Sequence, residues 1–162
     1  MIVSRLIRCA LALCFAFGLT ACEEKNSLMK DVASAANPVG YFEIPVSDLD
    51  RAVGFYRRVF GIEFTRETVD GYDMALFPEA EGARGATGAL AKGDVYVPGK
   101  AGPILYFSVA SIDTVLERLG ELDGVVLYPK KSLGAQGFVA EIDDSEGNRI
   151  ALHQPASSPQ GD

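Results

Sequence analysis

The stretch IPVSDLDRAVGFYRRVFG, residues 44–61, decides the fold, because it joins the end of a strand to a complete amphipathic helix. Ser47 or Asp48 is placed to cap the amino end of this helix, and Gly61 to end it in a left-handed conformation. Between them, apolar residues recur at the spacing of one helix face: Leu49, Ala52, Val53, Tyr56 and Val59 or Phe60. The stretch therefore predicts a strand, a helix and a glycine stop.

The strand that leads into this helix alternates between two faces, because neighbouring side chains of a strand point in opposite directions. Phe42, Ile44 and Val46 share an apolar face, which we expect to pack against the helix. Tyr41 and Glu43 share the opposite face. A register shift of one residue would exchange the two sets, so the burial of these side chains tests the predicted register.

The same pattern occurs a second time, 63 residues further along the chain. Residues 104–124, ILYFSVASIDTVLERLGELDG, can be set over residues 41–61 with apolar, acidic and glycine positions in step. Three short strands are expected after each helix, at about residues 63–69, 72–77 and 86–92, and again at about 125–130, 136–143 and 149–153. The repeat predicts an α+β fold of two βαβββ modules, whose curled mixed sheets form a shared cleft.

This doubled unit resembles the vicinal oxygen chelate superfamily, which includes glyoxalase I, fosfomycin- and bleomycin-resistance proteins and extradiol dioxygenases. The resemblance rests on the stretch quoted above and on DSEGNRIALHQP, residues 144–155. It covers about residues 39–155, which we take as the folded domain, with residues 156–162 as a flexible tail. These motifs contain packing and turn residues, so they specify the fold far better than the activity.

The resemblance implies that catalytic relatives bind one divalent metal with His, Glu or Gln side chains from matching strands. Those positions fall here on Tyr41, Gly88 or Ala89, Ile104 and Ala151. None of them supplies an imidazole or a carboxylate, so we expect no metal and no other cofactor. Whether the domain is an enzyme stays open, and no catalytic residue can be assigned.

We expect the cleft to bind a small organic ligand through Tyr41, Glu43, Tyr106 and His153. Aromatic rings supply contact area, and the polar groups fix the orientation of a ligand. The alternative is a lyase or isomerase of the glyoxalase or dioxygenase type. That activity would need a non-standard metal site, with Glu43 and His153 as first ligands and Tyr106 as a third.

The amino terminus has the pattern of an export signal. Arg5 and Arg8 precede an uncharged apolar run at residues 9–21, which is short for a membrane-spanning helix. The sequence Leu-Thr-Ala-Cys ending at Cys22 resembles the bacterial lipobox, in which the cysteine is acylated after cleavage. An ordinary signal peptide with an incidental Cys22, or a short membrane anchor, is the alternative.

We therefore predict a signal peptide at residues 1–21 and a lipidated tether at residues 22–38. Several acyl chains on Cys22 would hold the protein stably on a membrane, whereas one chain would not. The expected location is the bacterial cell envelope, facing the periplasm. Glu23 follows the cysteine where an Asp commonly retains lipoproteins at the inner membrane, which by resemblance favours the outer membrane.

Charge and cysteine content exclude several other classes of protein. The formal net charge is −7 and no basic run is present, so nucleic acid is not an expected partner. All three cysteines lie in the first 22 residues, which excludes a disulfide scaffold or a cysteine nucleophile in the domain. The resemblance also implies a homodimer in which the first strands meet across a two-fold axis, with a monomer as the alternative.

Overall fold

The computed structural model describes residues 39–79, 81–82 and 85–156. The predicted signal peptide, the tether with Cys22, and the tail beyond residue 156 lie outside the described residues. Among the described residues, no helix combines the length and the apolar character needed to cross a bilayer.

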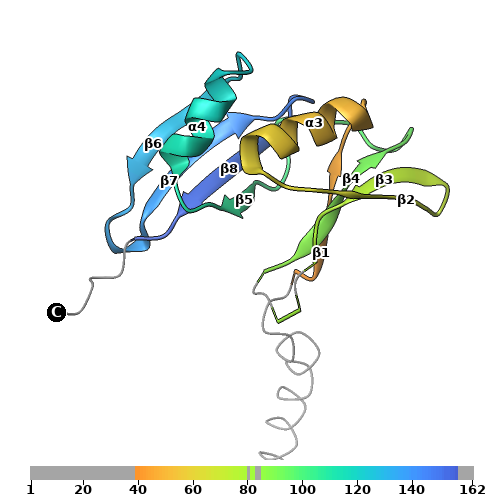
Figure 1. Ribbon diagram of the computed structural model, residues 1–162, viewed down its shortest axis with the longest axis horizontal. Coiled ribbons are helices and arrows are strands. Elements are labelled where there is room, and N and C mark those ends of the chain that lie inside the picture. Colours follow the sequence, from red (N-terminus) through yellow and green to blue (C-terminus); the bar gives the residue numbers. More distant parts are fainter. Residues whose placement is uncertain (1–38, 80, 83–84, 157–162) are drawn as a thin grey trace, which may run out of the picture. The chain divides into compact units, whose positions relative to one another are not determined.

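Two βαβββ modules make up the domain, as the repeat predicts (Figure 1). The first, which we call module 1, contains β1 (Tyr41–Pro45), α3 (Leu49–Phe60), β2 (Thr65–Val69), β3 (Tyr72–Leu76) and β4 (Thr87–Lys92). Module 2 contains β5 (Leu105–Ser108), α4 (Ile112–Gly120), β6 (Val126–Ser132), the 3-10 turn η1 (Gly134–Gln136), β7 (Phe138–Asp143) and β8 (Arg149–Gln154).

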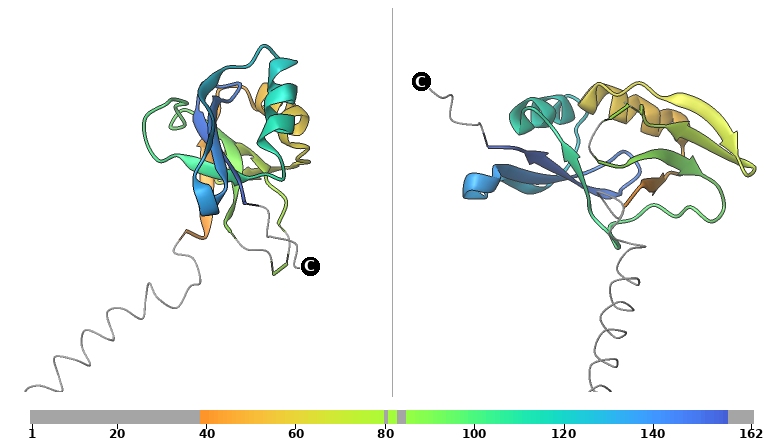
Figure 2. Two further views of the ribbon diagram at one scale, coloured as in Figure 1. Left: turned by 90° about the vertical axis from the view of Figure 1, so that its left-hand side faces the viewer. Right: turned by 90° about the horizontal axis from the view of Figure 1, so that it is seen from below.

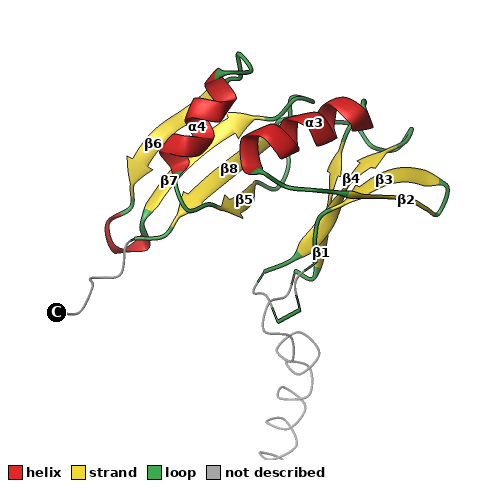
Figure 3. Ribbon diagram, viewed as in Figure 1, coloured by secondary structure: helices red, strands yellow, loops and turns green. Residues whose placement is uncertain are grey.

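Each module forms its own four-stranded mixed sheet, in the order β1-β4-β3-β2 and β5-β8-β7-β6. The first strand is parallel to the fourth, and the remaining pairs are antiparallel. Both helices cover the same side of the two sheets, so the opposite faces of both sheets are turned to a common side (Figures 2 and 3). The two sheets are not closed into one barrel.

Helix α3 begins and ends where the sequence predicts. The Asp48 carboxylate, rather than Ser47, accepts the capping hydrogen bond from the Arg51 amide at 2.9 Å. Gly61 has φ 72° and its N–H donates to the carbonyl of Arg57, which ends the helix in the left-handed region. These local signals are confirmed.

Helix α4 departs from the predicted copy at its carboxyl end. Ser111 caps its start, but the helix ends at Gly120, and the left-handed residue that follows is Asp123, with φ 52°. A Cβ on Gly124 would lie 2.2 Å from the side chain of Leu119. Gly124 is therefore required for close packing rather than as the helix stop that the repeat suggests.

The core lies between the helices and the sheets and unites both modules. Ile44 and Val46 are buried and Phe42 packs against them, while Glu43 lies on the opposite face, so the predicted strand register is confirmed. Tyr56 is fully buried at the centre of an aromatic cluster formed with Phe60, Phe64, Phe77 and Phe107. Phe55 is also buried, although the predicted helix face omitted it.

The two stretches that carry the family resemblance meet at the junction of the modules. The Glu146 carboxylate accepts hydrogen bonds from the amide of Ser47 at 3.0 Å, from its hydroxyl at 2.6 Å, and from Arg51 Nε at 2.8 Å. Tyr56 donates to Asp144 at 3.0 Å, and Asn148 donates to the carbonyl of Pro45 at 2.9 Å. Residues 144–148 therefore hold the start of α3 and the end of β1 in place through these hydrogen bonds.

Burial opposes ionisation of Glu146, but the hydrogen bonds from Arg51, Ser47 and the Asp48 amide outweigh it and lower its pKa to about 2. Burial raises the pKa of Asp144, and the hydrogen bonds that it accepts from Asn148 act against that rise. The junction is thus held by an ionised Glu146 over the physiological range.

Candidate functional site

The four predicted site residues all lie on the face of their sheet that is turned away from the helices. Tyr41 and Glu43 are on β1, Tyr106 is on β5 and His153 is on β8. The structure brings Tyr106 and His153 together in one pocket of module 2, and that pocket includes neither Tyr41 nor Glu43. The predicted set is therefore divided between the two modules.

The pocket of module 2 has a volume of about 680 Å³. Strand register explains its lining, because Tyr106, Ala151, Glu141 and Tyr128 are consecutive partners in one row across β5, β8, β7 and β6. Ala151 itself is fully buried and is not part of the lining. The pocket lining consists of Tyr106, Tyr128, Leu133, Gln136, Val139, Glu141 and His153.

Two polar groups of this pocket have fixed orientations. Glu141 Oε2 accepts from Arg149 Nε at 2.8 Å and from Arg149 Nη2 at 2.6 Å, so its carboxylate is held against the sheet. His153 Nε2 lies 2.8 Å from the carbonyl oxygen of Gln136. A carbonyl only accepts, so Nε2 carries the proton and Nδ1 of the neutral ring is left as an acceptor.

Most of this lining was not predicted from the sequence. Glu141 could have been predicted, because it alternates with the buried Ala140 and Ile142 and so lies on the face of β7 that is turned away from the helices. Tyr128 could not, because the register of β6 against β7 shifts on both sides of it. Such bulges follow from the local backbone, and the alternation rule gives no sign of them.

Module 1 presents a different surface on the same side. Tyr96, from the segment between β4 and β5, donates its hydroxyl hydrogen to Glu43 Oε2 at 2.6 Å. Its ring meets that of Tyr72 edge to face, with 5.3 Å between centroids. The hydrogen bond to Glu43 raises the pKa of Tyr96 to about 12, so the phenol stays protonated. The predicted ligand residue Glu43 is thus bound to a side chain of its own chain.

The residues present do not fit the metal of the catalytic relatives. Ala89 and Ala151 are fully buried and have no donor atom. Gly88 is excluded as a ligand position because a Cβ there would lie 2.2 Å from the carbonyl oxygen of Phe42. Within the described ranges, no three His, Cys, Asp or Glu side chains are grouped so that they could hold a metal ion.

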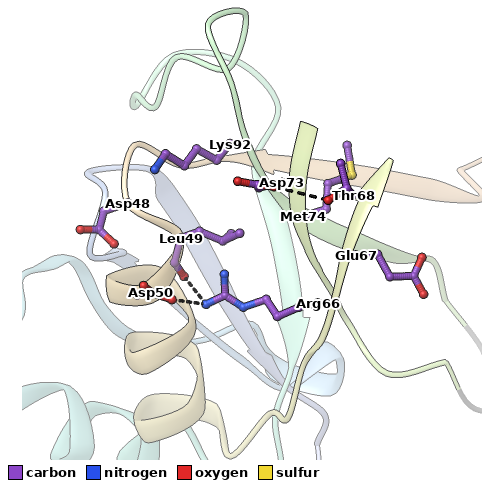
Figure 4. A pocket seen from close by; sticks show the side chains of 9 residues that line it. All are labelled: Asp48, Leu49, Asp50, Arg66, Glu67, Thr68, Asp73, Met74 and Lys92. Carbon is purple, nitrogen blue, oxygen red and sulfur yellow. Dashed lines mark hydrogen bonds and ion pairs between the residues drawn. The ribbon is translucent and has the colours of Figure 1, made fainter. Parts of the chain in front are cut away.

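A second pocket, of about 470 Å³, lies between the amino end of α3 and strands β2 to β4 (Figure 4). Its lining is mostly charged, and Arg66 spans it to reach Asp50 Oδ1 at 2.6 Å and the carbonyl of Leu49 at 3.4 Å. This arrangement ties β2 to the helix. The charged side chains of Arg66 and Asp50 in this pocket therefore have a structural role, because they join β2 to the start of α3.

The sequence profile of the Glyoxalase/Bleomycin resistance protein/Dioxygenase superfamily matches residues 39–152, and the chain belongs to this superfamily. The resemblance drawn from the sequence is confirmed. No curated protein matches the chain.

Several solved structures share the fold. TnmS3, an antibiotic binding protein from Streptomyces sp. CB03234, is 25% identical with a TM-score of 0.55, over 75% of this chain and 98% of that one. The fosfomycin resistance protein FosX from Listeria monocytogenes is 17% identical with a TM-score of 0.58, over 76% and 94%. The trypanothione-dependent glyoxalase I of Leishmania major is 22% identical with a TM-score of 0.57, over 70% and 84%.

Proposed function

We propose that the chain is an envelope lipoprotein whose domain binds a small aromatic molecule, without a metal, in the pocket of module 2. The observation that carries this proposal is the row of Tyr106, Ala151, Glu141 and Tyr128 across the open sheet. Tyr106 and Tyr128 both line the pocket, together with the carboxylate of Glu141, which Arg149 holds in place. The two aromatic rings provide contact area for a flat ligand.

The chemistry of the lining favours a ligand with hydrogen-bond donors. The Glu141 carboxylate lines the pocket as an acceptor, and its charge is paired with Arg149. Nδ1 of neutral His153 adds a second acceptor. The likeness to TnmS3, an antibiotic binding protein, supports binding rather than turnover.

A binding screen tests this proposal. The purified full chain is scanned for thermal shifts against aromatic compounds, including natural-product antibiotics, and the affinity of each hit is measured by calorimetry. Glu141→Gln and Tyr106→Ala are expected to weaken a hit at least tenfold, because they remove the held charge and one ring. The control Glu117→Gln, on the exposed side of α4, is expected to leave the affinity unchanged.

The same preparation distinguishes the alternative enzyme. A glyoxalase- or dioxygenase-type lyase or isomerase would retain a metal, so stoichiometric zinc, nickel or iron after purification without chelator would contradict the proposal. Tyr41→Ala and Glu43→Ala complete the test of the predicted ligand residues. Loss of affinity in these two variants would mean that the ligand spans both modules.

We further propose that Cys22 is lipidated and that residues 1–21 are removed as a signal peptide. Residues 22–38 then tether the domain to the periplasmic side of the envelope, with the outer membrane favoured. Labelled palmitate is expected to enter the wild-type protein and to be absent from Cys22→Ser, because acyl transfer needs the sulfur. Label retained by Cys22→Ser would contradict the anchor.

A homodimer is the proposed oligomeric state. β1 is an edge strand, and Tyr41 on it is 49% exposed, so this edge can pair with a second copy. Sedimentation in detergent at micromolar concentration is expected to show a dimer. A single monomer species would contradict it.

A further inference from the structure

Tyr96 lies on module 1 in the manner of a bound ligand. It comes from residues 93–103, which we call the strap, between β4 and β5. The strap runs along the face of the sheet opposite α3, where the two views of Figure 2 show it in green. The tyrosine ring packs against a small buried cluster of Met74, Ala89 and Ala91, and its hydroxyl reaches Glu43.

The residues beneath the Tyr96 ring are apolar and buried. Ala89 and Ala91 are fully buried and Met74 is 4% exposed where the Tyr96 ring packs over them, and we call this seat the recess. Tyr72 forms one wall of the recess, and its position requires Gly93, where a Cβ would lie 2.2 Å from the Tyr72 ring. At the far end of the ring, Glu43 Oε2 accepts the hydrogen bond from the Tyr96 hydroxyl.

The strap places little besides Tyr96 on this face. Val95 and Val97, on either side of Tyr96, are 65% and 77% exposed. The other attachments of the strap lie at its far end, where Gly99 N–H donates to Asn148 Oδ1 at 2.8 Å and Lys100 pairs with Asp143 at 2.7 Å. Apart from Tyr96, this end of the strap therefore contributes few apolar contacts that would resist local opening, whereas the far end is attached to Asn148 and Asp143.

We propose that module 1 contains a second ligand site, selective for a phenol, which Tyr96 occupies in the closed strap and vacates when the strap lifts. A free phenol would reproduce both contacts of Tyr96, with its ring against Tyr72 and its hydroxyl donating to Glu43. The ring finds apolar contacts with the buried Met74, Ala89 and Ala91, and Glu43 Oε2 accepts the hydroxyl at 2.6 Å, so this hydrogen bond is what distinguishes a phenol from an unsubstituted ring. This site is separate from the pocket of module 2 and stands whether or not that pocket binds a ligand.

The test removes the internal phenol and supplies an external one. In the full chain carrying Tyr96→Ala, p-cresol at millimolar concentration is expected to raise the melting temperature by several degrees, whereas toluene, which has the same ring and methyl group without the hydroxyl, is expected to raise it much less. Tyr96→Ala combined with Glu43→Gln is expected to lose the difference between the two probes. Tyr96→Phe, which keeps the ring in place, is expected to show no p-cresol effect.

Equal shifts with p-cresol and toluene, or equal shifts in the wild-type chain and in Tyr96→Ala, would overturn the proposal. Tyr106→Ala reports on the pocket of module 2 in the same assay, so the two sites can fail independently.

A second measurement needs no truncated side chain. In the wild-type chain labelled with 3-fluorotyrosine, Tyr96 is assigned by the fluorine signal that Tyr96→Phe removes. Saturating p-cresol is expected to move this signal toward the position of an exposed tyrosine. A Tyr96 signal that stays in place up to the solubility limit of p-cresol would overturn the proposal, even if Tyr96→Ala does not fold.

Discussion

Module 1 and module 2 have the same topology, but on the side of the sheets opposite the helices the described part of module 2 carries a pocket, whereas module 1 carries the side chain of Tyr96. The repeat sets Glu43 on β1 over Tyr106 on β5, and Ala89 on β4 lies in the same place in its row as Ala151 on β8. Both alanines are fully buried and lie mid-sheet. The Tyr96 side chain packs against the cluster that contains Ala89, whereas Tyr106 and Glu141, the neighbours of Ala151 in its row, line the pocket of module 2.

This difference shows that the repeat fixes the helix side of each sheet, while the connecting segments decide what its other side can do. The helix side must bury apolar residues in both modules, since neither sheet folds without them. The opposite side is free to vary. A single strap residue is enough to change an open face into an occupied one.

The largest expected effect tests the side of the two sheets that faces the helices. Ile44→Ala in module 1 and Phe107→Ala at the matching position of module 2 both remove side chains from the common core. Each is expected to lower the free energy of unfolding by about 2–5 kcal/mol, from lost burial and the cavity left behind. Urea unfolding measures both values. A loss below about 1 kcal/mol for either one would mean that the strand register is wrong.

The next effect tests the junction that joins the modules. Glu146→Gln is expected to cost about 2–3 kcal/mol at pH 7, because it removes an ionised acceptor shared by Ser47 and Arg51. The pKa of Glu146 is about 2 in the folded chain and near its ordinary value when unfolded. Its stabilisation is therefore complete above about pH 5 and is lost as the pH falls toward 2.

The pH dependence of the unfolding free energy provides a control for the Glu146→Gln prediction. The difference in unfolding free energy between the wild-type chain and Glu146→Gln is expected to shrink steadily below about pH 5. Asp144, whose pKa is raised, acts in the opposite direction but is present in both proteins and cancels. A difference that does not change between pH 7 and pH 3 would contradict the role given to the ionised Glu146.

The smallest expected effects compare the two sheet faces that are turned away from the helices. Tyr96→Ala is expected to lower the free energy of unfolding more than Tyr106→Ala does, because it removes a ring packed on Met74, Ala89 and Ala91 together with its hydrogen bond to Glu43. Tyr106 is 55% exposed, so Tyr106→Ala is expected to cost less than about 0.5 kcal/mol. Thermal melts of both variants check this ordering. Equal costs would remove the distinction between an occupied and an open face.

The fold could be predicted because its signals are local. The cap at Asp48, the stop at Gly61 and the apolar alternation around Ile44 each depend on a few neighbouring residues, and all three are confirmed. The end of α4 was predicted wrongly for the same reason. A repeat carries over the position of Gly124 but not the packing against Leu119 that gives the glycine its role there.

The site could be predicted only in part, because it depends on contacts between distant segments. Alternation placed Tyr106 and His153 on one face, but the partner across the row, Tyr128, follows from a bulged register. The occupation of Glu43 by Tyr96 joins residues 53 positions apart through an irregular segment. Periodicity carries no information about such a contact.

The most direct test of the central claim uses the six tyrosines of the chain as reporters. With 3-fluorotyrosine in the full chain, each fluorine signal is assigned by a Tyr→Phe variant and followed while a hit from the aromatic screen is added. We predict saturable shifts of Tyr106 and Tyr128, with Tyr56 in the core unmoved. Shifts of Tyr41, Tyr72 and Tyr96 without any change at Tyr106 and Tyr128 would contradict the assignment of the ligand to module 2.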